Sequence, residues 1–395
     1  MRLLVYSHFF SPSVGGVETV VFNLARGLAE LRLSDGQAEF KVTVVTQIPS
    51  EPLNDREFPF RVVRQPRLTQ LWHLIRSSEV IHLAGPAFSP LALGMLARIP
   101  IVLEHHGYQS ICPNGLLLHH PSNTVCPGHF KLRHYFECLR CNSFQSTWVR
   151  SCVSVLLMFP RCFLARRVAA NVAVSQHVLN RIGGQPNASI VYHGIDTSLD
   201  TKLICVPILA MGDKLCFAYV GRLVREKGIS VLLEATRILR KENLNFEVRV
   251  IGDGPERPRL ERQIMELEIS SCVNMLGFLT GSALERALED VGAVILPTVM
   301  EETAGLAVME QMLRGRLVIA SDIGGLSEVV AESGLRFQPG DAVALASAMR
   351  EVIQQPSIIH SLGQKARSRA LDSFSLERMV ESHARIYRRL LTVRN

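Results

Sequence analysis

The sequence has 395 residues, of which 47% are hydrophobic and 20% charged, and its formal net charge is +7. A chain of this length predicts two domains, each large enough to bury its own core. Nine cysteines in so long a chain are too few for a protein built on a disulfide framework. The most apolar stretch, residues 80–103, is interrupted by Pro86, Pro90, Arg98 and Pro100, which argues against an integral membrane protein.

The positive charge is concentrated in the first half of the chain. Residues 1–200 hold 18 Lys/Arg and 12 Asp/Glu, whereas residues 201–395 hold 25 and 24. A basic first half predicts an anionic partner on that side. The apolar start, residues 3–6, is too short for a signal peptide, which favours a cytoplasmic location.

Taken in chain order, short apolar runs alternate with amphipathic segments. In the first half they predict strands at 2–6, 41–46, 80–83, 100–104, 169–174 and 189–192, and helices at 17–31 and 90–98. In the second half they predict strands at 215–220, 246–251, 273–276, 293–296 and 317–320, and helices at 229–240, 257–267, 283–288 and 306–314. Continuously apolar strands between helices are typical of parallel sheets covered on both faces. We therefore predict an α/β protein of two Rossmann-like domains, joined by a linker near residues 196–213.

The end of the chain predicts a further amphipathic helix. Apolar residues between 376 and 391 recur at i, i+3 and i+4 spacing. A helix with one apolar face packs on a neighbouring surface, and either domain offers one.

The loop after the first strand of the second domain carries two cations. Arg222 follows Gly221, and Lys227 precedes Gly228 immediately before a predicted helix. Ligands of open α/β sheets bind outside the carboxyl ends of the strands, and a helix N-terminus favours anions. The pattern predicts a diphosphate site, with a solvated loop as the alternative.

Two glutamates follow the fourth predicted strand of this domain. Glu302 lies in the loop and Glu310 about two turns into the next helix, so both can face one cleft. Carboxylates bind vicinal hydroxyls, and Gly305 lets backbone amides approach a phosphate. The pattern predicts contacts to a sugar ring and a ribose, unless these are ordinary surface glutamates.

The first domain offers a glycine pair and a histidine at strand ends. Gly15 and Gly16 open a predicted helix, which permits close approach of a ligand or merely a tight turn. His106 follows a predicted strand, where its imidazole can bond a sugar hydroxyl or be a loop histidine without a role.

Four cysteines lie within thirty residues: Cys112, Cys126, Cys138 and Cys141. The last two have the spacing of a metal knuckle, and the first two complete a tetrahedral thiolate set for a structural zinc ion. Reduced thiols, or a redox disulfide, are the alternatives.

The same region is strongly basic. Residues 131–167 contain seven Lys/Arg against the single acid Glu137, interleaved with Trp148 and the apolar run 153–159. This composition favours contact with an anionic membrane surface, although a buried apolar helix with a charged end fits equally. No recognition motif accompanies the charge, so we do not expect nucleic acid as a partner.

Taken together, these motifs resemble the GT-B-fold retaining glycosyltransferases of the glycosyltransferase family 4 type. The matching residues, in the order that the family has them, are 15–18, His106, Ser175, 194–196, 221–222, 227–228, Glu302 and Glu310. They extend over nearly the whole chain.

The resemblance implies two domains facing a central cleft, with boundaries at 1–198 (including an insertion at about 107–167) and 199–373. The final helix, 374–395, would cross back onto the first domain. Arg222 and Lys227 would hold the donor diphosphate in place of a metal, so that no cofactor is required for catalysis. Glu310 would bind the ribose, and Glu302 would bind the donor sugar together with the amides of Gly305 and Leu306. His106 would contact the sugar hydroxyls. Gly16 would lie close to the phosphates or the acceptor.

The expected activity is hexosyl transfer with retention, from a UDP- or GDP-linked sugar to a lipid-linked or saccharide acceptor, in synthesis of cell-surface polysaccharide or glycolipid. The enzyme would be cytoplasmic or peripheral on the inner face of the cytoplasmic membrane. Ala304, Gln311 and Gly107 depart from the family's usual residues, which bears on donor-sugar identity. The alternatives are another GT-B chemistry, such as an epimerase or phosphorylase, and a non-catalytic nucleotide-sugar-binding protein.

Overall fold

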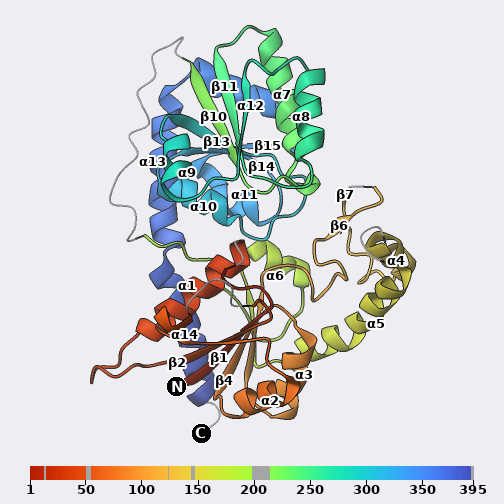
Figure 1. Ribbon diagram of the computed structural model, residues 1–395, viewed down its shortest axis with the longest axis vertical. Coiled ribbons are helices and arrows are strands. Elements are labelled where there is room, and N and C mark those ends of the chain that lie inside the picture. The colour runs from red at the N-terminus through yellow and green to blue at the C-terminus, as the bar shows by residue number, and fades with distance from the viewer. Residues whose placement is uncertain (13–14, 50–54, 123, 144–146, 198–213, 393–395) are drawn as a thin grey trace. The chain divides into compact units, whose positions relative to one another are not determined.

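The computed structural model describes residues 1–12, 15–49, 55–122, 124–143, 147–197 and 214–392. The chain divides by its contacts into two compact units (Figure 1). Unit 1 comprises residues 1–196 and 374–395, and unit 2 comprises residues 197–373. The predicted boundary after residue 198 lies two residues later than the observed one after residue 196. The predicted boundary after residue 373 is the same as the observed one. Most of the predicted linker, residues 198–213, lies outside the described residues.

Unit 1 is built on a parallel sheet of seven strands. In spatial order these are β3 (Arg61–Arg64), β2 (Lys41–Thr46), β1 (Arg2–Ser7), β4 (Val80–Ala84), β5 (Ile101–His105), β8 (Ala170–Ala173) and β9 (Ala188–Ile190). The helices are α1 (Gly16–Glu30), α2 (Leu68–Arg76), α3 (Phe88–Leu96), α6 (Gln176–Ile182) and α14 (Leu376–Thr392). Between β5 and β8 lie β6 (Leu118–His119), β7 (Thr124–Val125), α4 (Tyr135–Ser143) and α5 (Trp148–Ala165).

Unit 2 has a parallel sheet of six strands. In spatial order these are β12 (Val273–Gly277), β11 (Phe246–Ile251), β10 (Leu215–Val220), β13 (Val291–Leu296), β14 (Leu317–Ser321) and β15 (Leu335–Phe337). Its helices are α7 (Ile229–Lys241), α8 (Arg257–Glu266), α9 (Gly281–Ala287), α10 (Leu306–Leu313), α11 (Gly324–Val330), α12 (Ala342–Gln354) and α13 (Ser357–Ser373). Every residue of β13 and β14 is buried, as expected for strands covered on both faces.

The last helix returns to unit 1. After α13, which belongs to unit 2, α14 contacts α1. Val380 of α14 fills the space that a side chain at Gly27 would occupy, because a Cβ there would lie 2.4 Å from Val380 Cγ2. Arg388 donates to both carboxylate oxygens of Glu39 at 2.6 and 2.8 Å. The predicted return of this helix to the first domain is confirmed.

Helix α5 is the most exposed apolar element of unit 1. It contacts α3 and α4 and buries Val155, Met158 and Ala165. By length and composition alone it could cross a membrane, and 22% of it is buried. It lies outside residues 80–103, the stretch on which the prediction against an integral membrane protein rested.

Candidate functional site

The order of the strands in unit 2 locates a ligand site. Strand β10 lies between β11, the next strand in the chain, and β13, the third strand after it. The chain builds the sheet outward from β10 through β11 to β12 and then crosses back to the other side of β10 at β13. Open parallel sheets bind ligands at such a switch, outside the carboxyl ends of the strands. The loops that follow β10 and β13 therefore form the candidate donor site of unit 2.

Backbone contacts tie these two loops together. The Thr298 hydroxyl and the Val299 amide both donate to the Glu226 carbonyl at 3.0 Å. Gly228 has a φ of +67°, and a Cβ there would lie 1.9 Å from the Pro297 carbonyl oxygen. Only glycine allows this approach, and it brings Lys227 beside the loop after β13.

The predicted Lys227 and Glu302, 75 positions apart in the sequence, form an ion pair and hydrogen bond. Both side chains are partly buried, at 25% and 14% exposure. The Arg222 side chain is exposed, and among the described residues it forms no ion pair. The Tyr219 hydroxyl donates to the Arg222 carbonyl at 2.8 Å, which holds that loop in place.

Glu302 is positioned by a second backbone contact. The Gly325 amide donates to the Glu302 carbonyl at 2.7 Å. Gly324 has a φ of +64°, and a Cβ there would lie 2.6 Å from the same carbonyl oxygen. The glycine pair at 324–325 thus opens α11 and supports the loop that carries Glu302.

Helix α10 presents its N-terminus at the same edge of the sheet. Gly305 begins it with a φ of +82°, and no side chain caps the first amides. Free amides at a helix N-terminus suit an anion. Glu310 on this helix is exposed, although the protein around its carboxyl group raises the pKa by desolvation. Its exposure leaves the carboxylate accessible to a ligand.

In unit 1, the predicted His106 is largely buried, with 4% of its side chain exposed. Its Nδ1 lies 3.0 Å from His193 Nε2, and its Nε2 lies 3.3 Å from Glu104 Oε2. Both ring nitrogens therefore face protein groups. The expected contact of His106 to a sugar hydroxyl stays a prediction.

Glu104 is the centre of a cluster that sequence reasoning missed. Its Oε2 lies 3.0 Å from His82 Nε2 and 3.6 Å from His383 Nε2. Burial by itself would raise the pKa of Glu104, but the neighbouring histidines hold it well below its ordinary value. Two signals were available: His82 interrupts an apolar strand, and His383 lies on the apolar face of α14.

The glycine pair of unit 1 lies at the start of α1. Gly16 is exposed, and a Cβ there would have no neighbour within 4 Å. Packing among the described residues therefore does not require glycine at this position. Residues 13 and 14, which precede the pair, lie outside the described residues.

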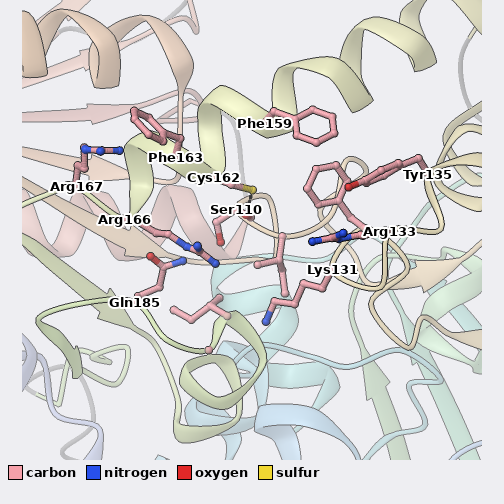
Figure 2. Close-up of a pocket in the computed structure, with 14 residues that line it drawn as sticks. Ser110, Lys131, Arg133, Tyr135, Phe159, Cys162, Phe163, Arg166, Arg167 and Gln185 are labelled. Carbon is pink, nitrogen blue, oxygen red and sulfur yellow. Dashed lines mark hydrogen bonds between the residues drawn. The ribbon is translucent and has the colours of Figure 1, made fainter.

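A basic and aromatic pocket of about 740 Å³ lies beside α5 (Figure 2). Arg133 and Arg166 extend toward its middle from opposite sides, with Lys131 below them and Phe159 above. Burial and the charges of Arg181 and Arg166 lower the pKa of Lys131. No Asp or Glu is among the residues that line it. An excess of cations in a partly apolar pocket favours an amphipathic anion.

The four predicted cysteines come together. Cys112, Cys126, Cys138 and Cys141 are each 7% exposed and line one small cavity with Asn114 and His129.

Comparison with known families assigns the class of this fold. The model of glycosyl transferases group 1 matches residues 207–369, and the model of glycosyltransferase family 4 matches residues 14–199. The chain therefore belongs to the GT-B-fold glycosyltransferases of the family 4 type, and the predicted fold class is confirmed.

Several curated relatives share part of the sequence. The chain is 26% identical over 182 residues to α-D-kanosaminyltransferase of Streptomyces kanamyceticus, covering 46% of this chain and 47% of that protein. It is 29% identical over 188 residues to an amylovoran biosynthesis glycosyltransferase of Erwinia amylovora, covering 46% of each. The chain spans about half the length of these relatives.

Solved structures share the fold over the whole chain. The Anabaena protein HepE, in complex with UDP and glucose, has a TM-score of 0.70 and 19% identity, with 98% of both chains covered. The sucrose-phosphate synthase of Thermosynechococcus elongatus has a TM-score of 0.74 and 20% identity, with 99% of both chains covered.

Proposed function

We propose that this chain is a retaining hexosyltransferase that takes its sugar from a UDP- or GDP-linked donor, without a catalytic metal. The observation that carries the proposal is the pairing of Lys227 with Glu302 at the switch point of the unit 2 sheet. A cation and a carboxylate held side by side, next to the free N-terminus of α10, match the diphosphate and hydroxyls of a nucleotide sugar.

In this proposal the cations of unit 2 act on the leaving group. Arg222 and Lys227 bind the donor diphosphate, which competes with Glu302 for the Lys227 ammonium. Glu302 then orients the sugar hydroxyls, the Gly305 and Leu306 amides stabilise the adjacent negative charge, and Glu310 accepts from the ribose. Stabilising charge that develops on a departing group is a large contribution to catalysis.

Retention is explained by attack on the face that the leaving group vacates. The bond from the anomeric carbon to the diphosphate oxygen breaks, and its electron pair stays on the diphosphate. The acceptor hydroxyl oxygen forms the new bond to that carbon on the same face. Its proton passes to the departing phosphate oxygen, so no nucleophile of the protein is required.

The comparisons support the donor class at a coarser level. HepE binds UDP and UDP-glucose in its structures, and one relative serves amylovoran biosynthesis. We extend these properties to this chain as part of the proposal, which places it in polysaccharide or glycolipid synthesis.

The test is turnover with a panel of UDP- and GDP-sugars in the absence of added divalent cations. We expect slow donor hydrolysis by the protein alone, and sugar transfer once membrane lipid extract supplies an acceptor. Binding of a donor without turnover under both conditions would instead favour the non-catalytic nucleotide-sugar-binding protein.

Two variants test the assignment of Lys227 and Glu302 to the proposed donor site. Lys227→Ala and Glu302→Gln should each lower kcat/KM by at least about 100-fold, as for loss of one charge-stabilising group. Lys241→Ala removes the same charge at the far end of α7 and should leave kcat/KM unchanged. Near-normal activity of either site variant would refute the assignment.

For the acceptor side we propose a lipid-linked anion presented at a membrane surface. Exposed apolar side chains run along α5, at positions Trp148, Val149, Val153, Leu156, Phe159 and Phe163. Arg166 and Arg167 follow the end of this helix, and the Arg167 guanidinium lies 3.5 Å from the centre of the Phe163 ring. Apolar side chains beside cations fit the interface of an anionic leaflet.

The basic pocket in Figure 2 suits the head group of such an acceptor. Lys131, Arg133 and Arg166 would bind its phosphates, while Phe159 and Phe163 meet the start of its hydrocarbon chain. A saccharide acceptor without a lipid is the alternative. We accordingly propose a cytoplasmic enzyme that is peripheral on the inner face of the cytoplasmic membrane.

Vesicle sedimentation tests this surface. The chain should pellet with vesicles containing phosphatidylglycerol and much less with phosphatidylcholine, and the binding should weaken with salt. Leu156→Glu with Phe163→Glu should reduce binding at least tenfold. Leu68→Glu changes an equally exposed leucine on α2 and serves as the control. Equal binding of the chain to both kinds of vesicle would contradict the proposal. Undiminished binding of the α5 variant to vesicles containing phosphatidylglycerol would also contradict it.

A further inference from the structure

We propose that unit 1 binds one structural Zn²⁺ through the sulfur atoms of Cys112, Cys126, Cys138 and Cys141. The site is independent of the transferase chemistry proposed for unit 2. Its role is to hold the irregular segment between β5 and α5.

The four sulfurs come from three separate pieces of chain. Cys112 follows the end of β5, Cys126 follows β7, and Cys138 and Cys141 lie one turn apart on α4. All four thiols are free, and they line a cavity of about 10 Å³. A space of this size has room for one ion or one water molecule.

Hydrogen-bond donors point at these sulfurs. The Gly128 amide donates to Cys126 Sγ at 3.4 Å, and the His120 amide donates to Cys141 Sγ at 3.4 Å. The Asn114 side-chain amide donates to Cys141 Sγ at 3.2 Å. Donors around sulfur stabilise the negative charge of a thiolate, and such outer contacts orient metal ligands.

At Cys112 the thiol donates to the Asn114 side-chain oxygen at 3.0 Å. Gly128 has a φ of +97° and Gly115 a φ of +76°, a left-handed conformation that favours glycine. Gly128 therefore lets the chain turn its amide toward Cys126 Sγ.

A divalent cation would offset the negative charge that four thiolates bring into one small cavity. No carboxylate lines the cavity to supply charge or to ligate a hard cation. Zinc prefers four thiolates in a closed tetrahedral site, and it would neutralise half of their charge.

The described part of this segment contains little regular secondary structure. Its regular structure consists of the two-residue strands β6 and β7 and the helix α4. Residues 130–135, which supply one wall of the basic pocket, lie between the second and third cysteines. The proposed ion would therefore also fix that wall in position.

Metal analysis of the full chain, purified with reductant and without chelator, tests the site. We expect about one zinc per chain and no iron, and Co²⁺ substituted for zinc should show the intense visible bands of tetrahedral thiolate coordination. Cys138→Ser should lower the zinc content to near zero. Cys152→Ser, a half-buried cysteine of α5 outside the cavity, should retain it.

A second measurement uses the unmodified chain, so that the site can still be tested if Cys138→Ser fails to fold. An organomercurial should release one zinc per chain to a chromophoric chelator as the thiols are modified. Zinc near zero even after reconstitution, iron with sulfide, or two disulfides in place of four thiols would each overturn the proposal. None of these readouts depends on transferase activity.

Discussion

At the scale of single residues, the candidate donor site of unit 2 depends on backbone positions that only glycine satisfies. Gly228 combines a left-handed φ of +67° with a 1.9 Å approach to the Pro297 carbonyl. A Cβ at this position would be strained and would also push the loops after β10 and β13 apart. The pairing of Lys227 with Glu302 therefore rests on the missing side chain of the next residue.

We predict that Gly228→Ala lowers the unfolding free energy of unit 2 by at least about 2 kcal/mol and abolishes donor binding. Gly340→Ala is the matched control, because Gly340 has a φ of +77° with nothing within 4 Å. It should lower stability by only about 1 kcal/mol and leave binding intact. Urea unfolding by circular dichroism and donor titration measure both effects. Equal effects of the two variants would show that the close approach is unimportant.

The buried histidines around Glu104 make unit 1 sensitive to acid. Burial and the neighbouring His106 lower the pKa of His193 to about 3, below the value near 6.5 expected when unfolded. The unfolded chain therefore binds the proton first. The contribution of His193 to stability is present above about pH 6.5 and is lost as the pH falls toward 3.

We predict that the unfolding free energy of unit 1 decreases steadily between about pH 6 and pH 4. His193→Gln should reduce this slope by about 1.4 kcal/mol per pH unit, the effect of one proton. The two tryptophans of the chain, Trp72 and Trp148, both lie in unit 1, so urea unfolding followed by fluorescence reports on this unit. An unchanged slope in the variant would refute the assignment.

At the scale of elements, the final helix shows which features a sequence pattern predicts and which depend on packing in the folded chain. The apolar spacing of α14 predicts its length and its buried face. It places His383 on that face, but it does not predict that Glu104 is its neighbour, nor that the Tyr387 hydroxyl lies 2.9 Å from His82 Nδ1. These partners come from β4 and β5, about 300 residues earlier in the chain.

We predict that Tyr387→Phe lowers the unfolding free energy of unit 1 by about 1–2 kcal/mol, since it leaves the buried His82 nitrogen without this partner. Arg389→Ala, on the exposed face of α14, should change it by less than about 0.5 kcal/mol. Urea unfolding followed by tryptophan fluorescence measures both. If Tyr387→Phe were neutral, the contact to His82 would contribute nothing to docking of the helix.

Elements with strong apolar runs were predictable, and marginal ones were not. Strands at 215–220 and 246–251 have the predicted bounds, because each is a largely buried apolar run. The short strands β3 and β15 and the helices α2, α11, α12 and α13 were missed. The two glycines at the start of α11 obscure it in the sequence, and only the contact with Glu302 explains them.

At the scale of the molecule, the two units hold separate sets of functional residues. Lys227, Glu302 and the start of α10 belong to unit 2, whereas α5, the basic pocket and the four cysteines belong to unit 1. A ligand of one unit stabilises that unit by mass action. The absence of tryptophan from unit 2 makes the two responses separable.

We predict that UDP at about 100 times its dissociation constant stabilises unit 2 by about 2.7 kcal/mol. The unfolding transition followed by circular dichroism should gain a later phase, while the fluorescence transition of unit 1 stays in place. Lys227→Ala should abolish the shift. An equal shift in both signals would mean that the two units unfold together.

By itself, the sequence determined the two parallel α/β domains and the apolar face of the last helix, because local periodicity encodes them. Short motifs predicted the donor-site residues, and the family resemblance predicted that the last helix returns to unit 1. Tertiary structure decided which of these side chains are available. It pairs Lys227 with Glu302, turns His106 inward toward Glu104 and gathers four cysteines from three pieces of chain. The physical reason is that charge pairing and burial depend on neighbours distant in sequence, which no local pattern specifies.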